Sequence, residues 1–372
     1  MAYTPLPTRT DADANAAADV NQLQENIADT RSVQAAYALE NATKNAGFWG
    51  EVVYKDSDEI VIKTKKVNGN NSIGAFLNDG TFLTSSTDIT VKLDVPGSSG
   101  HILDGITAKL TNEWYILWAY EDSGGNLAFG FTWMPNATFS NANPTTTLTL
   151  NQINSQDIGL LFPEDAELVV WQDADEWETT LAYQDGGAVT YDATRTDPSI
   201  SSRTSTVLTL NATLDNSTFT ASSSVYQVSN FKPLAVDDGL IVDAIGARGY
   251  IDTGIRVRTD GTPDILEFII YDDVFRFDAD VDIYSTDATT ITLRNTYCPP
   301  DKQTGFYRPY IRNNGGTSSF SSKEYYSTTL RNTILSYDRS RTELFLPTRH
   351  SLLTIRFDAA TDRDFMILGY KI

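Results

Sequence analysis

The sequence contains very few of the side chains that build metal centres and disulfide frameworks. Among its 372 residues there is one cysteine, Cys298, and the two histidines, His101 and His350, lie far apart. A single cysteine excludes an intrachain disulfide and a cluster of thiolate ligands. Neither histidine stands in a His-x-x-x-His or His-Glu-x-x-His spacing. We therefore expect no metal site and no cofactor, and we interpret Cys298 as a buried or inert thiol.

Enzyme motifs and long apolar runs are also missing from the sequence. It contains no Gly-x-Ser-x-Gly nucleophile elbow and no glycine-rich phosphate loop. No stretch approaches the roughly 20 apolar residues of a membrane helix, and the N-terminus lacks the apolar core of a signal peptide. We expect a protein that is not an enzyme, does not insert into a membrane and is made without a secretion signal.

Positive charge is scarce relative to negative charge. The chain has 28 Lys plus Arg against 49 Asp plus Glu, which gives a formal net charge of -21. Such a charge repels phosphate backbones and anionic membrane surfaces, so we expect no nucleic-acid partner. It also discourages nonspecific aggregation, which suits a protein displayed in many copies, although many acidic enzymes share this property.

Aromatic residues, in contrast, are abundant. The 17 Phe, 18 Tyr and 6 Trp are too many for a disordered chain. A length of 372 residues exceeds what one hydrophobic core usually serves. We therefore expect a folded protein with two or more domains in series.

The N-terminal region predicts an arm followed by a helix. Pro5 and Pro7 favour extended backbone in residues 1–10. Residues 11–45 contain neither Gly nor Pro and are rich in Ala, Asn, Gln and Asp, which favours a helix. We interpret residues 1–47 as a docking arm and helix.

One face of this predicted helix carries a narrow apolar stripe with spacings of four, three and four residues. A stripe this narrow does not bury a lone helix, so it needs a partner. The partner is either the chain's own β structure or further copies of the helix around an axis. The stripe consists of Ala16, Val20, Leu23 and Ile27.

From residue 48 onward the pattern is that of β structure. Runs of β-branched and aromatic residues, such as 59–63 and 114–120, alternate with turn signals such as 122–126. No helical periodicity alternates with these runs, which favours antiparallel sheets. The sequence predicts a mainly β fold: a short N-terminal helical anchor followed by antiparallel, β-sandwich-like domains in series, at residues 48–235 and 236–372.

The boundary between these two domains is placed near residue 236. Phe231-Lys232-Pro233-Leu234, followed by Asp237-Asp238-Gly239, indicates a connection, after which a second β-rich block begins.

A segment over residues 170–178 has the residue types of a glycan site. On a strand, alternation would place two Trp and two Asp side chains on one face. Rings stack on sugars, while carboxylates accept hydroxyl hydrogen bonds or act as acid and base. An amphipathic hairpin with a solvated acidic turn explains the same pattern and is the simpler interpretation; sugar binding comes second and glycosidase chemistry third. The four residues are Trp171, Asp173, Asp175 and Trp177.

Asp278, Asp280 and Asp282 predict a row of carboxylates on one face of a regularly alternating strand. Neighbours in the row lie about 6.8 Å apart, so they share a cation only with a bulge or with ligands from elsewhere. A solvated acidic face is the first interpretation, and calcium at a subunit interface is the alternative.

A concentration of Tyr and Arg near residue 310 is typical of an interface, because these side chains offer large amphipathic contacts. Contact between subunits and contact with a receptor explain this concentration equally well. The residues are Tyr307, Arg308, Tyr310 and Arg312.

Three parts of the chain carry a resemblance to a known family: residues 5–10 with 19–27, residues 103–130, and residues 353–357 with 369–372. They resemble tail-fibre, tailspike and related appendage proteins of tailed bacteriophages. In these proteins a short arm and helix precede β domains. The likeness rests on these short segments, and none of them is a catalytic motif.

This resemblance implies a virion component that is made in the host cytoplasm and attached through its N-terminus, commonly as a homotrimer. Its partners would be copies of itself, other virion proteins and host surface glycan. The alternatives are a carbohydrate-binding receptor module and, less favoured, a polysaccharide depolymerase. The chain departs from longer fibres because it lacks a collagen-like or extended coiled-coil shaft.

Overall fold

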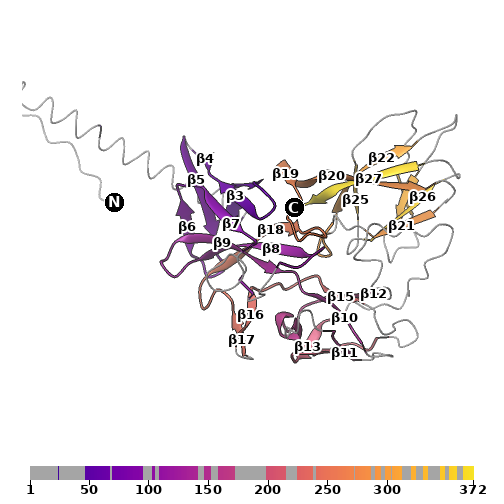
Figure 1. Ribbon diagram of the computed structural model, residues 1–372, viewed down its shortest axis with the longest axis horizontal. Coiled ribbons are helices and arrows are strands. Elements are labelled where there is room, and N and C mark those ends of the chain that lie inside the picture. Colours follow the sequence, from indigo (N-terminus) through magenta and orange to yellow (C-terminus); the bar gives the residue numbers. More distant parts are fainter. Residues whose placement is uncertain are drawn as a thin grey trace, which may run out of the picture.

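The computed structural model describes most of the chain from Gly47 to Ile372 (Figure 1). Its described residues are 24, 47–67, 69–94, 103–104, 109–140, 146–151, 158–171, 198–214, 224–237, 240–271, 273–285, 290–294, 298–302, 304–311, 320–323, 330–333, 344–347, 352–357 and 363–372. Beyond residue 277, side chains are described only at 298–302 and 369–372. The predicted anchor stripe of Ala16, Val20, Leu23 and Ile27 lies outside the described residues.

The described part of the chain is mainly β, and every strand pairing in it is antiparallel. It includes one short 3-10 helix, η1 (Ile158–Leu161). The predicted fold class is therefore confirmed at the level of an antiparallel, mainly β protein. The N-terminal helix and the arrangement of sandwich-like domains in series stay predictions.

Two small sheets follow Gly47. The first contains β1 (Phe48–Trp49), β4 (Lys65–Val67), β5 (Asn70–Phe76) and β6 (Phe82–Ser85). The second contains β2 (Glu51–Tyr54), β3 (Glu59–Lys63) and β7 (Ile89–Lys92). In β3, Ile60 and Ile62 are buried and their neighbours are less so, as expected for a strand with one face on the core.

The central sheet has the strand order β18-β8-β9. It consists of β8 (Trp114–Glu121), β9 (Leu127–Trp133) and β18 (Tyr250–Arg258). Residues 114–119 are all buried, so β8 is covered on both faces. The predicted turn over residues 122–126 joins β8 to β9, where the Asp122 carboxylate accepts the N–H groups of Gly124 and Asn126 at 2.8 Å each.

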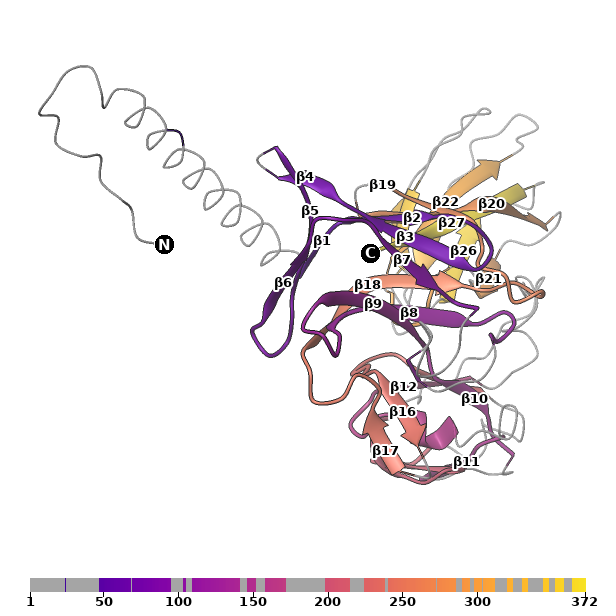
Figure 2. The same ribbon diagram turned by 60° about the vertical axis from the view of Figure 1, so that its left-hand side comes forward.

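The strands from β10 to β17 form a lower part of the molecule (Figure 2). One sheet contains β10 (Asn136–Thr138), β12 (Leu168–Trp171) and β15 (Ser224–Gln227), and another contains β11 (Thr147–Thr149), β13 (Ile200–Arg203) and β14 (Val207–Leu210). β16 (Leu234–Asp237) and β17 (Leu240–Asp243) form a hairpin. Leu148 and Leu208 face each other and are fully buried, which explains the Thr/Leu alternation of β11 and β14.

The C-terminal region forms two further sheets. The larger contains β19 (Phe268–Tyr271), β20 (Val274–Ser285), β27 (Arg363–Lys371), β22 (Thr304–Ile311) and β25 (Leu344–Pro347), in that order. The smaller contains β21 (Thr290–Arg294), β26 (Leu352–Phe357), β23 (Phe320–Lys323) and β24 (Leu330–Thr333).

Contacts join the two sides of the predicted domain boundary after residue 235. β18 lies beyond this boundary, yet it pairs with β8. The sequence signal Asp237-Asp238-Gly239 falls between β16 and β17, which pair as a hairpin. Aspartate followed by glycine is a hairpin signal as well as a linker signal. The division into residues 48–235 and 236–372 stays a prediction, and these contacts do not support it.

One hydrophobic core extends from Val52 to Tyr370. The ring of Trp114 in β8 contacts Phe277 of β20 at 6.0 Å and Tyr370 of β27 at 6.1 Å, measured between ring centroids. The central sheet and the larger C-terminal sheet therefore share aromatic packing.

Replacement of Ile116 by alanine tests the depth of this core. Ile116 is 1% exposed, so Ile116→Ala should lower the free energy of unfolding by about 2–5 kcal/mol through lost burial and a cavity. Ile269→Ala removes the same atoms from a side chain that is 57% exposed, and should cost no more than about 1 kcal/mol. Urea unfolding measures both values. Equal losses would contradict the assignment of β8 to the core.

Candidate functional site

The predicted glycan-binding residues fall at the edge of the described structure. Trp171 ends β12, where its backbone pairs with Ser224. Its side chain, and Asp173, Asp175 and Trp177, lie outside the described residues. The structure therefore does not bring these four residues together or separate them, and the glycan site stays a prediction.

The predicted Tyr/Arg interface lies partly in β22. Tyr307, Arg308 and Tyr310 belong to this strand, which pairs with β27 on one side and β25 on the other. The backbone of these residues is thus inside a sheet. Their side chains and the whole of Arg312 lie outside the described part, so the interface stays a prediction.

The predicted carboxylate row lies in β20, as expected for a strand. The pairing of β20 with β27 is irregular in this region, since Arg276 faces Gly369 but Val281 faces Ile367. A simple two-residue alternation therefore does not continue through Asp278 and Asp280. Among the residues that the structure describes, no group of three His, Cys, Asp or Glu side chains could hold a metal ion.

A polar network that sequence reasoning missed centres on an irregularity in β18. Asp252 faces Trp118 and Arg256 faces Ile116, so β18 has two more residues than β8 over this interval. Gly254 lies within this bulge at a φ of +78°, a conformation that favours glycine.

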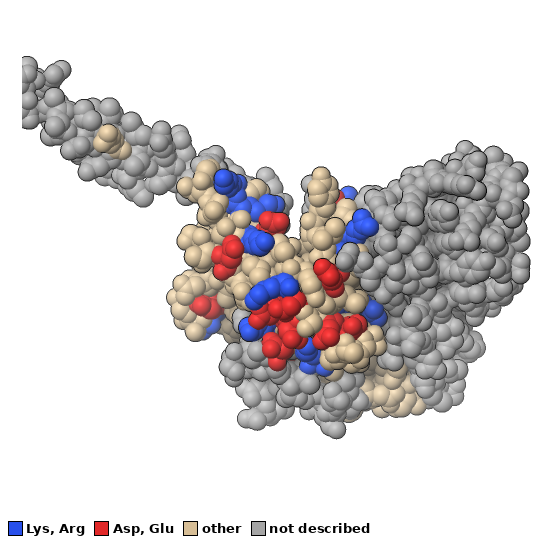
Figure 3. All heavy atoms as spheres, turned by 45° about the horizontal axis from the view of Figure 1, so that its top comes forward, with Lys and Arg blue, Asp and Glu red and all other residues tan. Residues whose placement is uncertain are grey.

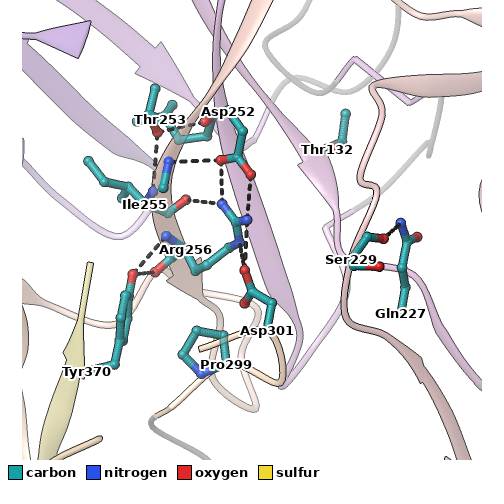
Figure 4. A network of polar contacts seen from close by, with 12 residues as sticks. Thr132, Gln227, Ser229, Asp252, Thr253, Ile255, Arg256, Pro299, Asp301 and Tyr370 are labelled. Carbon is teal, nitrogen blue, oxygen red and sulfur yellow. Dashed lines mark hydrogen bonds and ion pairs between the residues drawn. The ribbon is translucent and has the colours of Figure 1, made fainter. Parts of the chain in front are cut away.

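Local hydrogen bonds hold the bulge in shape. The Gly254 N–H donates to the Asp252 carboxylate at 2.8 Å. The Thr253 hydroxyl donates to the Leu117 carbonyl of β8 at 2.7 Å. The bulge thereby turns the Asp252 carboxylate toward the guanidinium of Arg256 (Figure 4).

Arg256 is the centre of the network and is 2% exposed. Its Nη1 and Nη2 atoms donate to the two carboxylate oxygens of Asp252, at 2.7 and 2.6 Å. Nε and Nη2 also contact Oδ2 of Asp301, at 3.2 and 2.9 Å. The planar guanidinium thus binds one carboxylate with two parallel hydrogen bonds and a second one at its side.

Tyr370 attaches the C-terminal strand to the same residue. Its hydroxyl accepts the Arg256 N–H at 2.8 Å and donates to the Arg256 carbonyl at 2.7 Å (Figure 4). β18 is the outer strand of its sheet, so these backbone groups have no neighbouring strand on that side. One tyrosine hydroxyl therefore satisfies both of them.

The charges of the network support one another. Burial alone opposes ionisation of Asp252, but the Arg256 charge and its hydrogen bonds prevail and lower the pKa of Asp252. Burial likewise opposes the charged form of Arg256, and the two aspartates outweigh it and raise the pKa of Arg256. The pKa of Lys302 is lowered, first by burial and then by the Arg256 charge. The Nζ atom of Lys302 lies 5.8 Å from the centre of the Tyr370 ring.

This arrangement is suited to holding segments together. Asp252 and Asp301 are committed to a guanidinium, and the Tyr370 hydroxyl is committed to backbone groups. The ring of Phe231 covers the guanidinium at 5.3 Å. The side chains of Arg256 and Asp301 are enclosed, whereas that of Asp252 is 33% exposed. The contacts of the network are electrostatic and structural.

A second polar cluster lies where β18 ends and β8 begins. Oε2 of Glu113 accepts the indole N–H of Trp133 at 2.9 Å and the side-chain amide of Asn136. The Glu113 backbone N–H donates to the Thr259 hydroxyl at 3.0 Å, and that hydroxyl donates to the Leu110 carbonyl at 2.7 Å. These contacts join β18 to β8 and β9 and are structural as well.

The structure describes Cys298 but neither histidine. Cys298 is fully buried, and its thiol faces the Pro299 carbonyl at 3.9 Å, so the buried-thiol interpretation is confirmed. His101 and His350 lie outside the described residues. In the described part of the chain, no helix has the length and hydropathy needed to cross a membrane.

Acidic and basic side chains are interspersed on the face shown in Figure 3. Hydrogen bonds from Lys55 and Lys92 lower the pKa of Glu59 to about 2. Lys109 forms ion pairs with Asp58 and Asp264. Neither sign of charge dominates the described part of this face.

Comparison of the chain with protein-family models, curated proteins and solved structures gave no match.

The pH dependence of stability should reveal the Arg256–Asp252 pair. Because folding lowers the pKa of Asp252, this carboxylate stabilises the fold above its unfolded pKa of about 3.9, and the contribution is lost as pH falls through the folded pKa. Asp252→Asn leaves Arg256 with one counter-charge, and because the Asp252 side chain is 33% exposed and partly screened by water, it should cost about 2 kcal/mol at pH 7. The difference in free energy of unfolding between wild type and variant should shrink below about pH 4.

Denaturant unfolding between pH 2 and 7 measures this difference. Asp88→Asn is a suitable control, because the Asp88 carboxylate is exposed and accepts hydrogen bonds only from Thr64 among the contacts described. A difference for Asp252→Asn that stays constant across this pH range would show that Asp252 contributes no electrostatic stabilisation.

Proposed function

We propose that the protein is a structural subunit of a bacteriophage particle: a fibre or appendage subunit that attaches through its N-terminal segment and projects β structure outward. Its partners in this proposal are copies of itself, assembled as a homotrimer, and other virion proteins bound by the N-terminal arm. Contact with host surface glycan is an additional role of the projecting part. No catalytic activity is part of the proposal.

The observation that carries the proposal is where the two ends of the described body lie. Gly47 precedes β1, and the sheet of β1, β5 and β6 lies on the opposite side of the body from β22 and β26 (Figures 1 and 2). Residues 370–372, in contrast, are built into the body: Tyr370 is fully buried, and the Ile372 N–H donates to the Asp273 carbonyl at 2.8 Å. Because residues 370–372 are built into the body, this observation supports attachment through the N-terminal segment and not through these residues.

The sequence provides two further lines of support. The N-terminal arm and predicted helix resemble those of phage appendage proteins. The strongly acidic composition favours solubility of a protein that is displayed in many copies. An antiparallel β body with polar groups engaged in structural contacts is compatible with both.

Deletion of residues 1–47 tests attachment. The truncated chain should fold, because the described core begins at Val52, and it should be absent from purified particles. Intact chain with the same epitope tag should be detected on particles by mass spectrometry and by immunogold electron microscopy. Equal incorporation of the truncated chain would contradict attachment through the N-terminus, and absence of the intact chain would contradict a virion role.

Oligomeric state tests the apolar stripe of the predicted helix. Light scattering of the 41.1 kDa chain should give the mass of a trimer. If the stripe pairs with copies of itself, Leu23→Asp with Ile27→Asp should convert the trimer to monomers, because buried carboxylates are costly to desolvate. Glu25→Gln is the control, since it lies off the stripe. A wild-type monomer at all concentrations would contradict assembly, and a trimer unaffected by the double substitution would place the contact elsewhere.

A further inference from the structure

The Arg256 network joins parts of the chain that are far apart in sequence. Arg256 lies in the central sheet, Asp301 is 45 residues away, and Tyr370 is 114 residues away in the larger C-terminal sheet. From these contacts we infer that the network is a clasp, which makes the central sheet and the larger C-terminal sheet unfold as one cooperative unit. The clasp is defined as Asp252, Arg256, Asp301 and Tyr370.

An incomplete clasp is unfavourable in free energy. A buried guanidinium needs counter-charges, and removal of one partner leaves an uncompensated charge in the interior. Likewise, without Tyr370 the N–H and carbonyl groups of Arg256 lose their partners. A state in which β18 is in place while β27 is detached therefore loses several interactions at once. Partly assembled states are disfavoured relative to both the folded and the unfolded chain.

A continuous row of ring contacts lies beside the clasp. Tyr54 of β2 contacts Phe268 at 6.0 Å, Phe268 stacks on Phe275 at 4.4 Å, and Phe275 stacks on Tyr370 at 4.9 Å between centroids. Tyr370 in turn contacts Trp114 of β8. The row begins and ends on strands that precede residue 122, and its middle members lie in the C-terminal sheet. Detaching that sheet breaks contacts at both ends.

Backbone segments approach one another closely around Tyr370. Gly369 has a φ of +151°, and a Cβ atom there would clash with the Phe275 carbonyl oxygen. On the other side, a Cβ atom on Gly254 would lie 3.3 Å from the Ile372 side chain. Residues 369–372 therefore fit closely against β20 and against the bulge of β18, with little freedom to shift.

Hydrogen exchange read by mass spectrometry tests the clasp in the full chain. Phe131→Leu removes buried ring atoms from β9 of the central sheet, which does not pair with β18, and should speed exchange in β9 about threefold or more. If the central sheet and the larger C-terminal sheet unfold as one unit, the slowest amides of β27 should speed up by the same factor. Acceleration confined to the central sheet would overturn the inference.

A second background tests whether the clasp itself provides the coupling. In a Tyr370→Phe chain, Phe131→Leu should accelerate exchange in β9 while the slowest amides of β27 respond less than those of β9. In a Tyr271→Phe chain the full coupling should persist, because Tyr271 is 76% exposed. Equal coupling in both backgrounds would show that sheet pairing and ring packing suffice without the clasp. If Tyr370→Phe does not fold, Phe231→Leu weakens the clasp more gently, since it removes only the ring over Arg256.

Discussion

A guanidinium group that leaves water must regain hydrogen bonds and counter-charge inside the protein. Arg256 regains them from Asp252 on its own strand and from Asp301. The bulge around Gly254 is what brings Asp252 within reach, and Tyr370 then completes the backbone of Arg256. The C-terminal strand therefore contacts the central sheet at the backbone of the residue whose side chain carries this buried charge.

The proposed function and the clasp place different demands on the molecule. Attachment to a particle requires a segment that is free to bind elsewhere, and the sequence predicts this role for residues 1–47. A projecting body, in contrast, benefits from a fold that does not open piecewise, because exposed strand edges invite aggregation. In the described structure, residues 370–372 contribute to that packed body.

Local pattern predicted the local structure well. The Ile60/Ile62 alternation, the apolar run at 114–119 and the turn at 122–126 each depend on neighbours in sequence, and the structure confirms them. The domain boundary near residue 236 stays a prediction, because an Asp-Gly step marks a hairpin as readily as a linker. Gly254 lies inside a strand, and a glycine at such a position often marks a bulge, so the sequence contained a signal for this feature. Nothing local in the sequence pairs Tyr370 with Arg256, because that contact arises from tertiary packing across 114 residues.

The buried ion network also has a thermal consequence. The free-energy penalty for taking charged groups out of water falls as temperature rises, whereas the stabilisation from burying apolar surface reaches a plateau. The aromatic row and the Arg256 network lie side by side around Tyr370, so their relative weights shift on heating. On heating, the Arg256 network therefore contributes a growing share of the stabilisation relative to the ring contacts.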